Sequence, residues 1–296
     1  NPITGALLTN PTQPLISSSF SIVDFMAFDR NNNDALDTIY AADLGGKVYV
    51  TRDSSESGSW SNTWSTASTP LFNARSSGGA NMVLKMFSAP DVALEDTHDY
   101  VFIGTGDREH PNARAVAAGR TQTVDRFYAI KNKWGGNAHS PLTETDLIDV
   151  TDYNYTGYTN FDQEAAHGWY IRLNERLGEK VLNRPVLFNR VVYLTTYVPP
   201  DPSVSGSTDA CIVDNLGEWR IYRLNYKTGE AAKDLSGDGQ KTRVDRSSVE
   251  GKGLPPQLSI AVTDKGPMLI IPTDDAIKSE SLSTDRDVVR YYWRQR

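Results

Sequence analysis

The sequence contains the stretch Asp29-Arg-Asn-Asn-Asn-Asp-Ala-Leu-Asp37, followed directly by Thr38-Ile-Tyr-Ala-Ala-Asp-Leu-Gly-Gly-Lys-Val-Tyr-Val50. Oxygen-bearing side chains occupy positions 1, 3, 5 and 9 of the first segment, a spacing that lets a tight loop surround a hard cation such as Ca²⁺. Position 7, Ala35, would contribute only its backbone carbonyl, as position 7 does in calcium loops. The segment after the loop predicts a pair of strands and not a helix. The sequence therefore predicts a calcium loop set into a β-sheet protein.

Strand patterns continue along the rest of the chain. The candidate strands are short, rich in Val, Ile, Tyr and Phe, and bounded by Gly, Asn, Asp and Pro, whereas helix signals are weak and confined to Asn112–Gly119 and Glu144–Asp149. Four strand-turn-strand units and one final strand are predicted: Thr38–Thr51, Tyr100–Thr105 with Arg126–Lys131, Val191–Tyr197 with Trp219–Asn225, Leu258–Val262 with Pro267–Pro272, and Val288–Trp293. The pattern indicates an all-β fold.

The second strands of the first three units and the final strand share an aromatic centre. They are Lys47–Val50, Arg126–Ile130, Trp219–Leu224 and Arg290–Trp293. They recur about every 70 to 95 residues, longer than the ~40–50 residues of a compact propeller blade, and long insertions between strands would account for the excess. We expect a β-propeller-like fold, modified or partial, whose aromatic side chains pack between sheets and do not stack on a ligand.

Composition narrows the class of protein. The 296 residues carry a net charge of -7, with 39% hydrophobic and 23% charged residues. This balance is globular and argues against a nucleic-acid partner, which would require a concentrated basic face. No apolar run approaches the ~20 residues that span a bilayer.

The chain starts at Asn1 without a methionine or a signal-peptide pattern, so we expect a processed or partial product of a longer precursor. Cys211 is the only cysteine and therefore forms no internal disulfide. Two interpretations of Cys211 remain. It either pairs with a cysteine on another chain or on a missing segment, or it is a buried free thiol.

Several segments together resemble the C-terminal β-propeller of the PilC/PilY family of type IV pilus tip-associated proteins. Residues 29–48 resemble the family's calcium loop followed by a Tyr-Ala-Gly-Asp-Leu-x-Gly-Asn-type hairpin, and Val101–Pro111 is similar to its Gly-Thr-Gly segment. Other similar segments follow in the family's order: Gly168–Leu173, Gly178–Val181, Arg184–Val186, Val191–Pro199 and the closing Tyr292–Gln295. The match covers most of residues 15–296, and the resemblance implies that residues 1–296 form a single propeller domain or the C-terminal portion of one.

The resemblance also implies a set of metal ligands in the loop at residues 29–37. They are Asp29, Asn31, Asn33, Ala35 through its carbonyl, and Asp37. Asp34 stands where such loops usually have glycine, although Asp tolerates left-handed backbone better than most residues. Position 12 would be Tyr40, so the bidentate acid of a helix-loop-helix site is absent. The alternative is an Asx-rich turn that caps itself with side-chain hydrogen bonds.

A second candidate is Asp234-Leu-Ser-Gly-Asp-Gly-Gln-Lys-Thr242. Against the generic calcium loop, the matching residues are Asp234, Ser236 and Asp238 at positions 1, 3 and 5, Gly239 at 6, Gln240 (carbonyl) at 7, Thr242 at 9 and Asp245 at 12. Ser-Gly and Asp-Gly also form ordinary hairpin turns, and Lys233 and Lys241 would oppose a cation. Calcium and a plain turn both remain open here.

No catalytic constellation is visible in the sequence. The four histidines, His98, His110, His139 and His167, lack zinc-ligand spacing, and no Ser or Cys nucleophile motif is present. The polar run Asp107–His110 is interpreted as an ion-pair network in a loop. We therefore expect a non-enzymatic protein.

The resemblance implies a type IV pilus tip-associated protein that supports pilus assembly, counters retraction and contributes to surface adhesion, with Ca²⁺ as the regulator. The implied partners are minor pilins of the tip complex, an upstream segment or another chain that completes the propeller, and a host or surface ligand. The implied location is extracellular, at the pilus tip of a Gram-negative bacterium, after export through the periplasm. The alternatives are a quinoprotein-type propeller dehydrogenase, suggested by Trp219–Glu230, and a surface module that binds sugar or a host protein.

Overall fold

The structure is a computed structural model that describes residues 15–34, 36–53, 67–74, 84–112, 124–133, 141–152, 167–200, 216–273 and 276–282. Within these residues the chain is built from strands, with two short 3₁₀ helices, η1 (Glu144–Asp146) and η2 (Arg243–Arg246). None of the helices in this part of the chain has the length and apolar character needed to cross a membrane.

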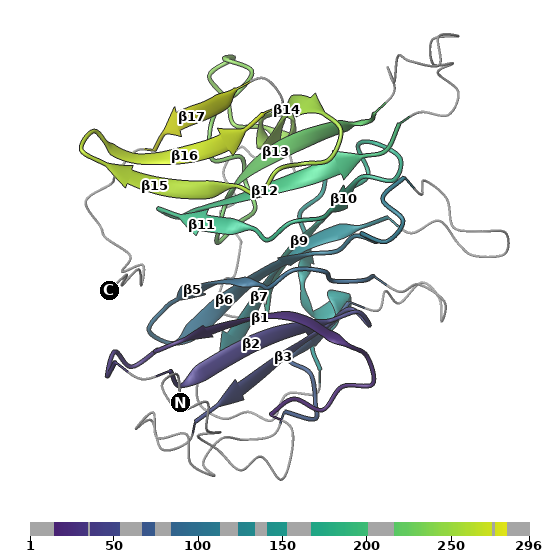
Figure 1. The fold of residues 1–296 in the computed structure, drawn as a ribbon, viewed down its shortest axis with the longest axis vertical. Helices are drawn as coiled ribbons and strands as arrows, with labels where there is room; N and C mark the ends of the chain where they lie inside the picture. Colours follow the sequence, from purple (N-terminus) through teal and green to yellow (C-terminus); the bar gives the residue numbers. More distant parts are fainter. Residues whose placement is uncertain are drawn as a thin grey trace, which may run out of the picture.

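The described strands form four sheets that follow one another along the chain and are stacked from the purple to the yellow end in Figure 1. The first contains β1 (Ile22–Phe28), β2 (Thr38–Asp43), β3 (Lys47–Arg52) and β4 (Phe72–Asn73). The second has the order β5 (Asp91–Leu94), β6 (His98–Gly104), β7 (Arg126–Lys133), β9 (Gly168–Arg172) and β8 (Ile148–Asp149). The third contains β10 (Lys180–Val181), β12 (Val191–Val198), β13 (Glu218–Asn225) and β14 (Ser247–Lys252), with β11 (Val186–Phe188) also paired to β12. The fourth contains β15 (Ser259–Thr263), β16 (Gly266–Pro272) and β17 (Ile277–Ser281).

The four predicted strand pairs are confirmed. β2 pairs with β3, β6 with β7, β12 with β13, and β15 with β16, all antiparallel. The turn after Asp43 depends on Gly46, whose φ is 76° and whose added Cβ would lie 2.4 Å from the Leu84 carbonyl oxygen. Only glycine satisfies both the left-handed backbone and this close approach.

One helix prediction is wrong and two predictions fall outside the described residues. Glu144–Asp146 forms a 3₁₀ turn, but the chain then extends into β8, which pairs in parallel with β9. The pairing with a neighbouring strand overrides a weak local helix signal. Most of the predicted helix Asn112–Gly119 and the final strand Val288–Trp293 lie outside the described part of the chain.

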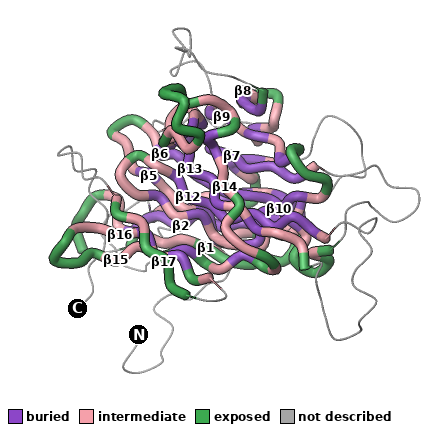
Figure 2. Tube along the Cα trace, turned by 90° about the horizontal axis from the view of Figure 1, so that it is seen from above, coloured by how far each residue is buried: buried purple, intermediate pink, exposed green. Residues whose placement is uncertain are grey.

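Alternating side chains of the inner sheets enter two different cores. On β6 and β7, Tyr100, Phe102, Phe127 and Ala129 face the third sheet, whereas Val101, Ile103, Tyr128 and Ile130 face the first. On β12 and β13, Val192, Leu194, Tyr222 and Leu224 face the second sheet, whereas Tyr193, Trp219 and Ile221 face the fourth. Since side chains of a strand alternate between faces, each inner sheet is buried on both sides, as Figure 2 shows for the central strands. The expected all-β, propeller-like fold is confirmed. The expected packing of aromatic residues between sheets is confirmed for β7 and β13, whereas Arg290–Trp293 lies outside the described residues.

Aspartates on the first strands of two sheets connect each sheet to the next. The Asp24 carboxylate on β1 accepts a hydrogen bond from the Ala89 N–H at 3.1 Å, and Asp91 on β5 accepts one from the Leu187 N–H at 2.7 Å. Burial raises the pKa of Asp91. The sheets are therefore joined by polar contacts as well as by their apolar faces.

Candidate metal centre

The loop at residues 29–37, hereafter loop 1, connects β1 to β2 and is organised by Asp29. Its carboxylate accepts hydrogen bonds from the backbone N–H groups of Asn32 (2.7 Å), Asn33 (3.1 Å) and Asp34 (2.6 Å). Asn32 and Asp34 have φ values of 66° and 68°, in the left-handed region. Asx residues tolerate this region better than other non-glycine residues, so Asp34 meets the backbone requirement that glycine usually meets at position 6.

Asp37 closes loop 1. Its carboxylate accepts hydrogen bonds from the N–H groups of Arg30, at 3.1 and 3.2 Å, and of Asn31, at 3.2 Å, and from the Thr38 hydroxyl at 2.7 Å. The side chain is buried, with 5% of the residue exposed, at the point where β2 begins. The buried strand therefore fixes one end of the loop and one of its two carboxylates.

The donor set of loop 1 fits a hard cation. Asp29, Asn31, Asn33 and Asp37 offer carboxylate and amide oxygens, the ligand type that Ca²⁺ prefers. The Asp29 carboxylate accepts three N–H groups, whereas each oxygen of Asp37 already accepts two contacts. Ala35 lies outside the described residues, so its carbonyl is not placed. The same hydrogen bonds also occur in a self-capped Asx turn.

The second candidate, residues 234–245 or loop 2, lies between β13 and β14. It repeats the polar frame of loop 1, in which one aspartate accepts N–H groups from the turn and a second aspartate closes the loop. The Asp234 carboxylate accepts hydrogen bonds from Gly237 N–H (2.7 Å), Gly239 N–H (2.8 Å) and the Ser236 hydroxyl (3.2 Å). Gly237 and Gly239 have φ values of 75° and 83°, so positions 4 and 6 are left-handed in both loops. The N–H groups, that of Gly239 first, lower the pKa of Asp234 below its ordinary value.

Asp245 closes loop 2 from position 12. It accepts hydrogen bonds from the N–H groups of Leu235 (3.0 Å), Ser236 (2.7 Å) and Thr242 (2.8 Å), and from the Thr242 hydroxyl (2.9 Å). Asp245 is buried and, as the third residue of η2, completes the capping box that begins at Thr242. The hydrogen bond from the Thr242 N–H is the main reason that the pKa of Asp245 lies well below its ordinary value.

Three carboxylates converge in loop 2. One oxygen from each of Asp234, Asp238 and Asp245 lies within 4.8 Å of the other two. Gln240 donates its N–H to Asp238 at 2.8 Å. From the sequence, the positive charge of Lys233 is expected to disfavour a cation in loop 2. Its side chain extends instead to Glu280, with an Nζ–Oε1 distance of 3.4 Å. The predicted residues Asp234, Asp238 and Asp245 are therefore brought together, whereas Thr242 is engaged with Asp245.

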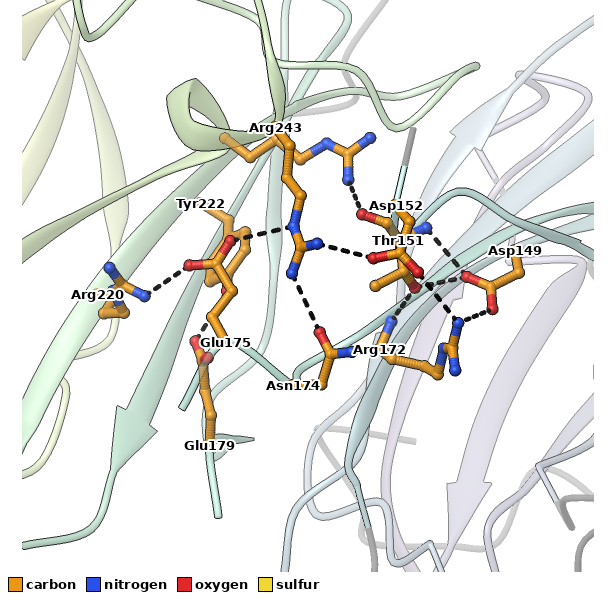
Figure 3. Close-up of polar contacts among 11 residues, drawn as sticks. Asp149, Thr151, Asp152, Arg172, Asn174, Glu175, Glu179, Arg220, Tyr222 and Arg243 are labelled. Atoms are coloured by element: carbon orange, nitrogen blue, oxygen red, sulfur yellow. Dashed lines mark hydrogen bonds and ion pairs between the residues drawn. The ribbon is translucent and has the colours of Figure 1, made fainter. Parts of the chain in front are cut away.

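Loop 2 is joined to the second sheet by arginine side chains that sequence reasoning did not identify. The Arg243 guanidinium contacts Asp152 at 2.7 Å, Asn174 at 3.3 Å and Glu175 at 3.6 Å, as Figure 3 shows. Arg246, buried, donates to the Thr151 carbonyl at 3.0 Å. No local pattern could reveal these contacts, because they join residues about 70 to 95 positions apart.

The same network continues into the core of the third sheet. Arg220 pairs with Glu175 at 2.9 Å, and the Tyr222 hydroxyl donates to Glu179 at 2.9 Å, as drawn in Figure 3. Burial raises the pKa of Glu179. These contacts connect the second and third sheets.

The other polar cluster singled out in the sequence is a surface ion-pair network. Lys85 Nζ lies 3.1 Å from Asp107 and 2.6 Å from Glu109, and His110 Nδ1 lies 3.2 Å from Asp107. His139 and Cys211 lie outside the described residues. The contacts agree with the interpretation of Asp107–His110 as ion pairs in a loop.

Comparison with known proteins identifies the fold. No protein-family model and no curated protein matches this chain. The crystal structure of the Pseudomonas aeruginosa PilY1 C-terminal domain is similar, with a TM-score of 0.59 and 18% sequence identity over 86% of this chain and 59% of the solved chain. This chain thus spans less than two thirds of the solved domain. The resemblance to the PilC/PilY propeller is confirmed at the level of the fold.

Proposed function

We propose that this chain is part of a type IV pilus tip-associated protein whose propeller binds Ca²⁺ in loop 1 and in loop 2. The observation that carries the proposal is the conjunction of a PilY1-like fold with two loops of calcium-ligand spacing built on one polar frame. The proposed role is non-enzymatic: Ca²⁺ regulates pilus biogenesis, retraction and adhesion at the cell surface.

The physical requirement is that the ion binds one conformation of the propeller better than another. Bound Ca²⁺ would supply positive charge among the carboxylates. In loop 1 the chain's own part is to hold the carboxylates of Asp29 and Asp37 through backbone N–H groups of the loop. In loop 2 the three carboxylates converge, and their repulsion without a cation favours an ion.

The proposed partners are minor pilins of the tip complex, a further segment or chain that completes the propeller, and a host or surface ligand. The proposed location is the outside of a Gram-negative cell. Both proposals rest on the family resemblance and on the shared fold.

Calorimetric titration of metal-stripped protein with Ca²⁺ tests the metal part of this proposal. We expect two binding events in the wild type, with one lost in Asp37→Ala and the other in Asp238→Ala. Asp264→Ala, in the exposed turn between β15 and β16, is the matched control because it removes an acidic side chain outside both loops. A wild type that takes up no Ca²⁺ would reduce both loops to turns and remove the proposed regulation.

The pilus part is tested separately in the source bacterium. Deletion of the gene is expected to reduce the number of surface pili counted by electron microscopy, and the wild-type gene is expected to restore it. Normal piliation and normal adhesion after deletion would contradict the pilus assignment, whatever the calorimetry shows.

A further inference from the structure

Arg30, at position 2 of loop 1, connects this loop to the neighbouring sheet. Its backbone N–H donates to the closing carboxylate of Asp37. Its guanidinium extends away from the loop, with Nε 3.3 Å from Asp99 Oδ1 and Nη2 donating to the Glu95 carbonyl at 2.7 Å. One residue therefore contacts the metal loop through its main chain and the second sheet through its side chain.

The receiving carboxylate is deeply buried. Asp99 lies on β6 with no exposed surface, and its other oxygen accepts a hydrogen bond from the Tyr40 hydroxyl at 2.7 Å. Asn132 on β7 donates to the same hydroxyl at 2.6 Å. A charge in such a place interacts more strongly than it would in water, so the position of Arg30 affects the contact between the first two sheets.

Glu95 extends the connection to the third sheet. It lies in the turn between β5 and β6, where its carbonyl accepts from Arg30 and its carboxylate accepts from the Tyr226 hydroxyl at 2.5 Å. Lys227 lies 3.2 Å from the same carboxylate. Residues 95–99 are therefore a junction at which the first, second and third sheets meet.

We propose that Arg30 is a positioning residue that transmits Ca²⁺ occupancy of loop 1 to this junction. The ion would fix Asp37 and, through it, the backbone of Arg30, so that the guanidinium is held against Asp99 and the Glu95 carbonyl. The loop would thereby control how firmly neighbouring sheets hold together. The inference rests on the proposed binding of Ca²⁺ in loop 1 and adds the route by which that binding acts on the fold.

Hydrogen exchange measured by mass spectrometry on the full chain, in Ca²⁺ and in chelator, tests the coupling. In the wild type we expect Ca²⁺ to slow exchange about threefold or more in peptides covering 29–37 and also in those covering 95–99. Arg30→Ala is expected to keep Ca²⁺ binding by calorimetry and protection of 29–37, but to lose the slowing at 95–99. Arg30→Lys, which retains the charge but not the fork of donors, is expected to be intermediate and serves if the alanine variant folds poorly.

Lys227→Ala is the matched control, because it removes a cation from Glu95 without touching loop 1. It is expected to retain the slowing at 95–99. Equal slowing in Arg30→Ala, or loss of Ca²⁺ binding in that variant, would overturn the role of Arg30. Binding without any change at 95–99 in the wild type refutes the coupling alone, whereas absence of binding refutes the proposed metal site as well.

Discussion

Loop 1 and loop 2 share an aspartate at position 1 and oxygen-bearing side chains at positions 3, 5 and 9, differ at most other positions, and have the same pattern of hydrogen bonds. In each, the aspartate at position 1 accepts N–H groups from positions 4 and 6, and these two positions have left-handed backbone. In each, a buried closing aspartate accepts the N–H groups of positions 2 and 3. The closing residue is Asp37 at position 9 in one and Asp245 at position 12 in the other. The polar frame therefore depends on which backbone N–H groups the two carboxylates accept. It does not depend on a fixed number of residues between the two aspartates.

The two loops differ in how they complete this frame. Loop 1 runs straight into a buried strand and uses Asx residues at the left-handed positions, whereas loop 2 closes through a 3₁₀ helix and uses glycine. Loop 1 has two carboxylates among its candidate ligands and loop 2 has three. Loop 1, which carries the family resemblance, thus has fewer negative ligands than loop 2. The following predictions test whether stability and Ca²⁺ affinity follow the resemblance or the number of carboxylates.

The largest effect is expected from removal of the closing aspartates. In calcium-free buffer, Asp37→Ala should lower the free energy of unfolding by about 1–3 kcal/mol, because the buried Thr38 hydroxyl and the partly buried N–H groups of Arg30 and Asn31 lose their acceptor. Asp245→Ala should destabilise at least as much, since it orphans four donors. Urea unfolding monitored by tryptophan fluorescence measures both.

Asp238→Ala is the control for this comparison. Asp238 is exposed and accepts one N–H, so its loss should change the free energy of unfolding by no more than about 0.5 kcal/mol in the absence of Ca²⁺. If the closing aspartates behave like Asp238, the shared frame has no part in the stability of the apo protein.

The next effect concerns affinity. Because calcium affinity rises with the number of charged ligands, we expect loop 2 to bind Ca²⁺ about tenfold more tightly than loop 1. Competition with a chromophoric chelator measures each loop in the variant that lacks the other, Asp37→Ala or Asp245→Ala. Asn33→Asp should narrow the difference. A tighter loop 1 would show that its anchorage to β2 outweighs the missing charge.

The sequence predicts the strand pairs well because their determinants are local. The turn glycine Gly46 and the apolar strands on either side of it specify the β2–β3 hairpin without reference to the rest of the chain. The segment Glu144–Asp149 shows the opposite case, since its capping box starts a turn but the pairing of β8 with β9 ends it. Local signals decide hairpins, and tertiary pairing decides short ambiguous segments.

For the candidate site, the oxygen donors are readable from spacing, but the groups that position them are not. Asp245 could be assigned to position 12 from the sequence, whereas its four hydrogen bonds require the fold. The contacts of Arg30 with Asp99 and of Arg243 with Asp152 bridge 69 and 91 residues. Such contacts depend on how sheets stack, which no local pattern encodes.

A smaller effect is expected at position 4, where Asn32 and Gly237 can be exchanged. A Cβ at Gly237 would meet nothing within 4 Å, so any cost there comes from the backbone alone. Gly237→Ala should lower the free energy of unfolding by about 1 kcal/mol, and Gly237→Asn by less. Asn32→Gly should be neutral or stabilising. Urea midpoints measure all three, and an alanine as tolerated as asparagine would contradict a left-handed requirement.

The smallest effect is a difference in acid sensitivity, and its sign follows from the lowered pKa values of Asp234 and Asp245. A carboxylate whose pKa is lower in the folded state stabilises the fold above its unfolded pKa of about 3.9, and this contribution is lost as pH falls through the folded value. In calcium-free buffer, the urea midpoint of the wild type should therefore fall more steeply below about pH 4 than that of Asp245→Asn. Asp125, whose pKa burial raises to about 6, contributes with the opposite sign between about pH 4 and 6. The difference in urea midpoint between wild type and Asp245→Asn at each pH removes the contribution of Asp125 and isolates loop 2. Parallel plots of midpoint against pH for the two proteins would show that the loop amides do not hold Asp245 ionised.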